Sequence, residues 1–122
     1  MNLKSYKDFT VWQKAMELVE EVYKLVKVLP KSETYVLSDQ MRRAAISIPS
    51  NIAEGQGRNN KREFVNFLSF AKGSQRELET QLQICVRVGY MNESDIAVAM
   101  MLCEEVGKML SSLVKSLKVS LN

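Results

Sequence analysis

Apolar residues recur at intervals of three and four along four stretches of the chain, a spacing that predicts four amphipathic helices. We expect these helices over residues 8–28, 38–54 and 60–88, and from residue 92 towards the C-terminus. The apolar positions of the last helix also fit a seven-residue repeat, which is typical of helices packed side by side. No stretch reads as a strand. The pattern predicts one all-α domain over residues 1–122, an antiparallel up-down-up-down four-helix bundle.

Short polar signals mark the expected helix ends. Thr10-Val-Trp-Gln13 and Asn60-Lys-Arg-Glu63 have the spacing of a capping box, in which side chains bond to the free backbone amides of the first turn. Asn92-Glu-Ser-Asp95 is another start of this kind. Leu29-Pro30 should stop the first helix, because the residue before a proline avoids the helical conformation.

The stretch Ser38–Gly57 is the most informative part of the chain. Ser38 is the expected N-cap, and Gly55 and Gly57 are expected to end the helix. Pro49 lies inside the helical pattern and cannot donate a hydrogen bond to the carbonyl of Ala45. We therefore expect the second helix to be kinked near Pro49.

The second helix is apolar on two faces, which indicates burial on more than one side. One face is formed by Met41, Ala44, Ala45, Ile48 and Ile52. A second face is formed by Ile46, Pro49 and Ala53. In so small a protein, the second face suggests a partner subunit. We predict a homo-oligomer with Ile46, Pro49 and Ala53 at the oligomer interface.

Composition argues against several kinds of active site. The chain is 46% hydrophobic and 25% charged, as in globular domains, and it contains no histidine, the commonest general base and metal ligand. Its two cysteines are too far apart for a usual zinc site, and both are expected to be buried free thiols. Arg43, Ser47, Ser50 and Glu54 share one face of the second helix, but no spacing supplies a base for a serine nucleophile. We expect no catalytic residue, no metal, no cofactor and no enzymatic activity.

The N-terminal segment is polar, and no apolar stretch approaches the length of about 20 residues that a membrane-spanning helix needs. We therefore expect no secretory leader and no contact with a membrane. The expected location is the cytoplasm.

Basic residues cluster after the start of the second helix. Arg42, Arg43, Arg58, Lys61 and Arg62 are five positive charges against one negative charge, that of Glu54. They could neutralise nucleic-acid phosphates, or they could lie on a solvated surface with internal pairs such as Glu54–Arg58. Lys61 and Arg62 should lie in the first turn of the third helix, where a positive charge opposes the helix dipole and costs about 0.3–1 kcal/mol. This unfavourable placement favours the nucleic-acid interpretation.

Several of these segments resemble one known family. They are Val11-Trp-Gln-Lys-Ala15, Gln40–Gly55, Glu63-Phe64, Phe67-Leu68, Ala71-Lys-Gly-Ser74, Glu77–Leu82 and Gly89-Tyr90. Together they resemble the four-helix-bundle proteins encoded in intervening sequences of bacterial 23S ribosomal RNA genes. The resemblance implies a ring of five subunits, a homopentamer, and supplies no catalytic residue and no agreed activity. The chain is also similar to the accessory variability determinant protein of diversity-generating retroelements, a basic pentamer that binds nucleic acid and a reverse transcriptase.

Two functional hypotheses follow. In the first, the chain is a non-enzymatic module that binds structured RNA or DNA through Arg42, Arg43, Arg58, Lys61 and Arg62, mainly by phosphate contacts. Five chains of formal charge +3 each would carry +15 together, which favours such a partner. In the second, the same ring is a protein-interaction scaffold that holds a polymerase or reverse transcriptase without reading nucleic acid itself.

Overall fold

The computed structural model describes residues 5–121, with side chains described as far as residue 119, and it contains four long helices. The helices are α1 (Thr10–Val26), α2 (Leu37–Gln56), α3 (Lys61–Arg87) and α4 (Glu93–Leu121). Two short 3₁₀ turns, η1 (Tyr6–Asp8) and η2 (Lys31–Glu33), precede α1 and α2. No strand occurs within the described residues, so the predicted all-α fold is confirmed. Residues 1–4, part of the polar N-terminal segment, lie outside them.

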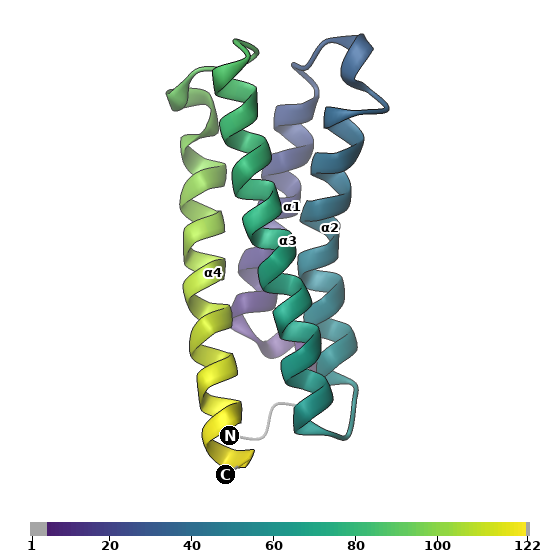
Figure 1. The fold of residues 1–122 in the computed structure, drawn as a ribbon, viewed down its shortest axis with the longest axis vertical. Coiled ribbons are helices and arrows are strands. Elements are labelled where there is room, and N and C mark those ends of the chain that lie inside the picture. Colours follow the sequence, from purple (N-terminus) through teal and green to yellow (C-terminus); the bar gives the residue numbers. More distant parts are fainter. Residues whose placement is uncertain (1–4, 122) are drawn as a thin grey trace.

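The four helices stand side by side, and the chain reverses direction at each short connection (Figure 1). α2 packs against α1 and α3, and α4 packs against the same two helices. Each helix therefore has two neighbours around one central core. The α2–α3 connection, η1 and the end of α4 lie at one end of the bundle (Figure 1). η2 and the α3–α4 connection lie at the opposite end.

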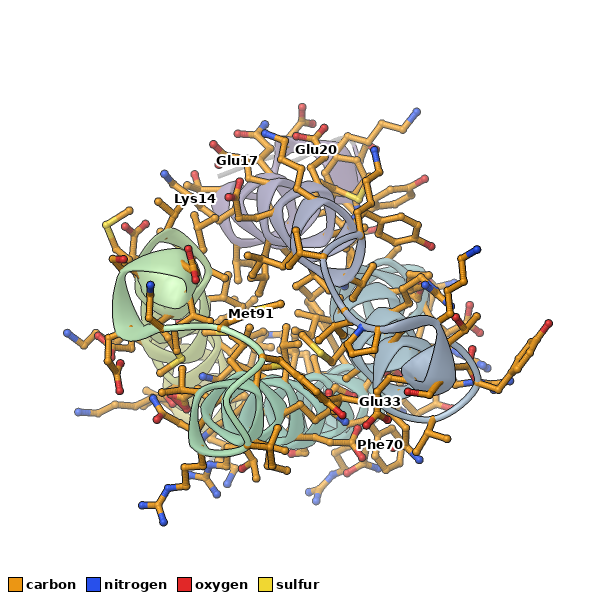
Figure 2. The ribbon with its side chains drawn as sticks, turned by 90° about the horizontal axis from the view of Figure 1, so that it is seen from above. Lys14, Glu17, Glu20, Glu33, Phe70 and Met91 are labelled. Carbon is orange, nitrogen blue, oxygen red and sulfur yellow. The ribbon has the colours of Figure 1, made fainter. Side chains whose placement is uncertain are left out.

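The core is built from the apolar stripes that the sequence predicts. Met41, Ala44, Ala45, Ile48 and Ile52 of α2 are all at most 2% exposed. Fully burying a leucine or isoleucine side chain stabilises the fold by about 1.5–3 kcal/mol, so such a stripe is enough to fix which face of α2 points inwards. Met91, in the α3–α4 connection, lies over the end of this core when the bundle is viewed from above (Figure 2). The remaining fully buried large side chains come from the other three helices: Leu18, Val22, Leu68, Leu78, Leu82, Cys85, Ile96, Val106 and Leu110.

Two helix starts form as predicted. The Asn60 side chain accepts a hydrogen bond from the backbone N–H of Glu63 at 3.1 Å and caps α3. At α4, Asn92 and Asp95 cap each other, because each side chain accepts a hydrogen bond from the other's backbone N–H at 2.9 Å. Gly89 follows α3 with φ +86, a left-handed conformation that glycine adopts without strain.

Two predicted N-caps are wrong. Ser38 is not the N-cap of α2, because the helix begins one residue earlier at Leu37 and Ser38 is buried within its first turn. Leu37 packs against the core, and this contact draws the helix start back by one residue. Thr10 does not cap α1 either: Phe9 occupies the N-cap position, and its ring stacks on Phe64 at 6.0 Å between centroids.

Gly55 does not end α2, which continues through Gln56. A Cβ at residue 55 would lie 2.7 Å from Cβ of Phe67 and 2.9 Å from Cδ1 of Phe64. The glycine therefore allows α2 and α3 to approach closely. Gly57 does follow the helix, in a right-handed conformation with φ -72.

Pro49 lies inside α2, and the helix runs on without interruption from Leu37 to Gln56. Two residues after Pro49, the Asn51 side-chain amide donates to the Ser47 carbonyl at 2.8 Å and to the Ser47 hydroxyl at 2.9 Å. Ser47 Oγ also accepts a hydrogen bond from Ser74 Oγ at 2.8 Å, which links α2 to α3. The polar residues around Pro49 thus hold the two helices together, and the kink itself stays a prediction.

Both cysteines are buried free thiols, as predicted. Cys85 Sγ lies 3.6 Å from the sulfur of Met41. Burial raises the pKa of Cys85, and it raises the pKa of Cys103 to about 12. Since the reactive form of cysteine is the thiolate, the raised pKa values and the burial both disfavour reaction of these thiols at neutral pH.

Candidate nucleic-acid interface

The five basic residues singled out in the sequence do not form one continuous surface. Arg42 and Arg43 lie in the second turn of α2, whereas Arg58 follows the end of this helix. Arg58 comes sixteen residues after Arg42, and nearly all of these residues belong to α2, so the two are about 24 Å apart along the helix axis. Lys61 and Arg62 lie with Arg58 at the α2–α3 connection. The predicted site is therefore divided between two levels of the bundle.

The two arginines in the second turn of α2 have partners within the chain. Arg42 is half-buried and its guanidinium donates to the carbonyl oxygen of Thr34 at 3.4 Å. This contact connects α2 to the end of η2. Arg43 Nε donates to the Asp39 carboxylate at 2.9 Å, one helical turn away. Its charge is largely balanced, although its side chain is 79% exposed.

Arg58 is positioned by two contacts at once. It donates from Nη2 to Glu54 Oε1 at 2.8 Å, the i,i+4 pair expected from the sequence. Its Cζ also lies 5.1 Å from the centre of the Phe67 ring, within the range of a cation–π interaction. The side chain remains exposed. It is thus held in place while part of the guanidinium stays open to solvent.

Lys61 and Arg62 are the first two residues of α3, as predicted, and both are exposed. At a helix N-terminus the aligned backbone dipoles already favour a negative partner. Two positive side chains in the same turn strengthen that preference.

The end of the bundle around the α2–α3 connection is predominantly positive, and we call it the basic end. η1 belongs to it, because Phe9 directly after η1 stacks on Phe64 of α3. The last turns of α4 lie at the same end (Figure 1). This end carries three acidic residues, Asp8, Glu54 and Glu63, and a larger number of basic residues. The basic set consists of Lys7, Arg58, Lys61, Arg62, Lys115 and Lys118.

Charges elsewhere are mixed and often paired. Lys24 lies 3.7 Å from Glu21 near the end of α1. On the side of the bundle, Lys14 lies 3.5 Å from Glu105 and 3.7 Å from Glu17, and it joins α1 to α4 (Figure 2). Exposed pairs of this kind contribute little to stability, but their opposite charges largely cancel each other. At the basic end, in contrast, basic residues outnumber acidic residues.

The predicted interface residues line a groove between α1 and α2. Ile46, Pro49 and Ala53 border a hollow of about 350 Å³ together with Trp12, Met16 and Val19 of α1. Ile46 is 42% exposed, whereas Pro49 is already buried within the single chain. The second apolar face of α2 is thus partly covered by α1, and Ile46 is its most accessible member.

Two further observations concern catalysis and membranes. Residues 5–121 contain no group of three or more cysteine, aspartate or glutamate side chains arranged to hold a metal ion. The described helices include none that is long and apolar enough to cross a membrane.

The fold and motifs match one family along most of the chain. The model of the 23S rRNA-intervening sequence protein family matches residues 7–112. The chain belongs to this family. The family is named for its place in a ribosomal RNA gene, and its name gives no activity. Comparison with curated proteins finds no match.

Among solved structures, the chain is similar to a protein from Bacteroides thetaiotaomicron described as a member of the S23 ribosomal protein family with unknown function. The two are 27% identical, with a TM-score of 0.81, and the likeness covers 87% of this chain and 99% of the other. The family match ends at residue 112, so Lys115 and Lys118 lie beyond it. The relation to the accessory variability determinant protein stays a prediction.

Proposed function

We propose that this member of the 23S rRNA-intervening sequence protein family is a non-enzymatic module that binds structured RNA or DNA through its basic end. The observation that carries the proposal is the presence of Lys61 and Arg62 in the first turn of α3. Helices favour acidic residues there, and each basic residue costs about 0.3–1 kcal/mol. A local preference is typically broken where a function requires it.

Phosphate contact is the mechanism that this arrangement supports. Lys61, Arg62 and the positioned guanidinium of Arg58 surround the start of α3, where backbone N–H groups also attract anions. Phosphate contacts fix position without reading bases, so the binding would depend on nucleic-acid shape and charge more than on sequence. Such binding weakens steeply with salt, because it is driven by counterion release.

Only some of the five basic residues predicted to bind nucleic acid are well placed to do so. Arg42 is engaged by the Thr34 carbonyl and Arg43 by Asp39, and both lie about 24 Å from the α2–α3 connection. We propose that Arg58, Lys61 and Arg62 make the main contacts. Lys7, Lys115 and Lys118 extend the same surface.

We further propose that the chain works in the cytoplasm as a homo-oligomer, a pentamer by family resemblance. Ile46, Pro49 and Ala53 in the α1–α2 groove would meet the neighbouring subunit. Assembly would bring several basic ends into one particle. Several modest phosphate-binding surfaces then act together, and the apparent affinity rises well above that of one copy.

The test is direct binding of the purified protein to a structured RNA and a DNA duplex at low salt, followed by titration with salt. We expect the protein to bind at least one of the two. The logarithm of its binding constant should fall linearly with the logarithm of the salt concentration. If the protein binds neither the RNA nor the DNA at low salt, the proposal is overturned.

A second candidate is a scaffold that holds a partner protein, such as a polymerase. The observation in its favour is the apolar α1–α2 groove, in which Ile46 and Met16 remain partly exposed. The same binding experiment separates the two candidates. A scaffold without nucleic-acid contact would leave both RNA and DNA unbound, and binding of a partner protein would then be lost on substitution of Ile46.

A further inference from the structure

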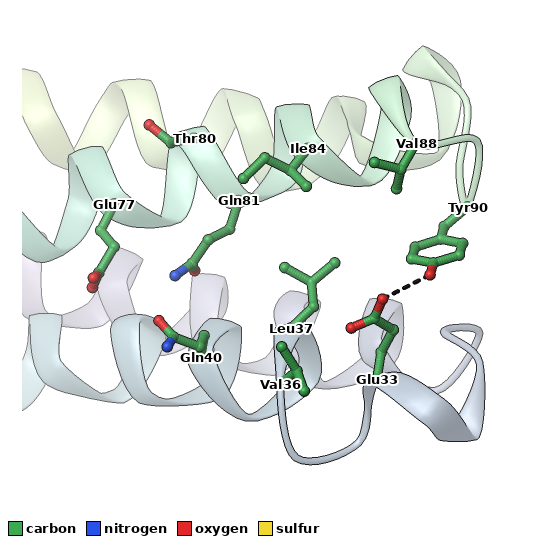
Figure 3. Close-up of a pocket in the computed structure, with 10 residues that line it drawn as sticks. All are labelled: Glu33, Val36, Leu37, Gln40, Glu77, Thr80, Gln81, Ile84, Val88 and Tyr90. Atoms are coloured by element: carbon green, nitrogen blue, oxygen red, sulfur yellow. Dashed lines mark hydrogen bonds between the residues drawn. The ribbon is translucent and has the colours of Figure 1, made fainter.

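A second hollow lies on the other side of α2, at the end opposite the basic end. It is a cleft of about 630 Å³ between the first turns of α2 and the last turns of α3 (Figure 3). Its apolar part is formed by Val36 and Leu37 on one side and by Ile84 and Val88 on the other. Val36, Ile84 and Val88 are 59%, 40% and 56% exposed. Binding pockets for small molecules typically have a volume of about 300–1,000 Å³ and a mostly apolar lining.

One end of the cleft is polar. Gln81 of α3 projects towards α2 and the side chain of Gln40, and Glu77 lies one turn before Gln81 (Figure 3). Gln81 is only 6% exposed, yet its Oε1 has no hydrogen-bond partner among the described residues. Leaving a buried acceptor unpaired is unfavourable, and native structures contain few such groups. A hydrogen-bond donor bound in the cleft would supply the partner that this oxygen lacks.

The rim of the cleft is acidic. Glu77 stands at the polar end and Glu33 at the other, and the described residues that line the cleft include no lysine or arginine. Glu33 accepts a hydrogen bond from the Tyr90 hydroxyl at 2.7 Å, which closes that end (Figure 3). Glu77 therefore remains as the carboxylate available to a ligand beside the unpaired Gln81 oxygen.

We propose that this cleft binds a small amphipathic amine. Its ammonium group would donate hydrogen bonds to Glu77 and Gln81 Oε1, and its apolar body would lie between Leu37 and Ile84. The positive charge matches the acidic rim, and an ammonium is a donor-only group that suits two oxygen acceptors. This site is about one bundle length from the basic end, so the proposal does not depend on nucleic-acid binding.

Three probes with the same apolar body test the charge preference: phenylpropylamine, phenylpropanol and phenylpropanoate. Each is titrated into the ¹⁵N-labelled full-length chain, and backbone and Gln81 side-chain amide shifts are followed. We expect shifts confined to the cleft, with the amine binding about tenfold more tightly than the alcohol, a difference of about 1.4 kcal/mol. The carboxylate should bind most weakly.

Two variants and a control locate the head group. Glu77→Gln and Gln81→Leu should each bring the affinity for the amine close to that for the alcohol. The control, Glu93→Gln on the exposed start of α4, should change neither the affinity for the amine nor the affinity for the alcohol. Gln81→Leu removes an unpaired polar group and should fold with an unchanged or higher Tm. Equal binding of all three probes, or no shifts at millimolar concentration, would overturn the proposal. Shifts of the cleft signals on dilution without any probe would also overturn it, because a second copy would then fill the cleft.

Discussion

The guanidinium of Arg58 lies over the ring of Phe67, with 5.1 Å between Cζ and the ring centroid. The ring belongs to α3, whereas Arg58 lies in the α2–α3 connection, so this contact holds the connection against α3 at the basic end. A side chain that is already positioned loses less conformational entropy on binding. Among the residues proposed to contact phosphate, Arg58 is therefore the one whose side chain is best preorganised for binding.

Arg58→Ala and Arg43→Ala form a matched pair. Both arginines are exposed, and both pair with a carboxylate one turn earlier, but only Arg58 lies at the basic end. We expect Arg58→Ala to weaken RNA binding several-fold and to reduce the salt slope by about 1, as loss of one phosphate contact does. Arg43→Ala should leave both unchanged. Fluorescence anisotropy across a salt series measures the slope, and equal effects of the two variants would contradict the assignment.

Gly55 and Gly73 provide a second matched pair, for stability. A Cβ at residue 55 would clash with Phe64 and Phe67, whereas a Cβ at residue 73 has no atom within 4 Å. We expect Gly55→Ala to lower the free energy of unfolding by about 1–3 kcal/mol through overpacking. Gly73→Ala should raise it by about 0.5–1 kcal/mol, because alanine is the better helix former. Urea denaturation measures both; a stabilising Gly55→Ala would show that α2 and α3 are not in such close contact.

These two glycines also show how far the sequence leads. The apolar periodicity is enough to predict the four helices and the buried face of α2, since each is set by residues close together in the chain. Gly55 was expected to end α2, but its position is decided by Phe64 and Phe67 on another helix. Ser38 likewise has the chemistry of an N-cap and is buried because Leu37 packs inwards. Contacts between helices override such local signals.

The candidate site follows the same rule. The position of Lys61 and Arg62 in the first turn of α3 was predictable, because the Asn60 cap is a local signal. Nothing in the spacing shows that Arg42 would bond to the Thr34 carbonyl or that the end of α4 would bring Lys115 and Lys118 to the same end of the bundle. The cleft beside Gln81 was also missed, since a glutamine at a core position carries no signal of an unpaired oxygen.

The two thiols should be protected in the folded chain. Burial raises the pKa of Cys103 from 9.0 to about 12 and also raises that of Cys85. At pH 8 we expect negligible alkylation by iodoacetamide in buffer and rapid alkylation of both cysteines in urea, measured by mass spectrometry. Rapid labelling of the native chain would contradict the buried placement.

The same shifts predict how stability depends on pH. The folded chain keeps its thiol protons at pH values where the unfolded chain has lost them, because the folded pKa is the higher one. The stabilisation is complete below pH about 9 and is lost as the pH rises towards 12. Urea unfolding across this range measures the decline.

Ile46 tests the proposed subunit contact. It is 42% exposed in the α1–α2 groove, and Met101 of α4 is a comparable exposed apolar residue at 52%. We expect Ile46→Asp to lower the sedimentation coefficient by dissociating the oligomer, because a charge buried at an interface is strongly unfavourable. Met101→Asp should leave it unchanged. A wild-type chain that sediments as a monomer would refute the assembly.

Charge reversal at the start of α3 tests the central claim most directly. Lys61→Glu/Arg62→Glu is compared with Lys31→Glu/Arg87→Glu, which changes the net charge equally at the opposite end. RNA binding is measured by anisotropy at low salt, and folding is checked by urea denaturation. We predict that the first variant loses binding while its stability rises by about 1 kcal/mol, since glutamate suits a helix N-terminus. The second should bind nearly as the wild type does. Unchanged RNA binding by the first variant would contradict the account.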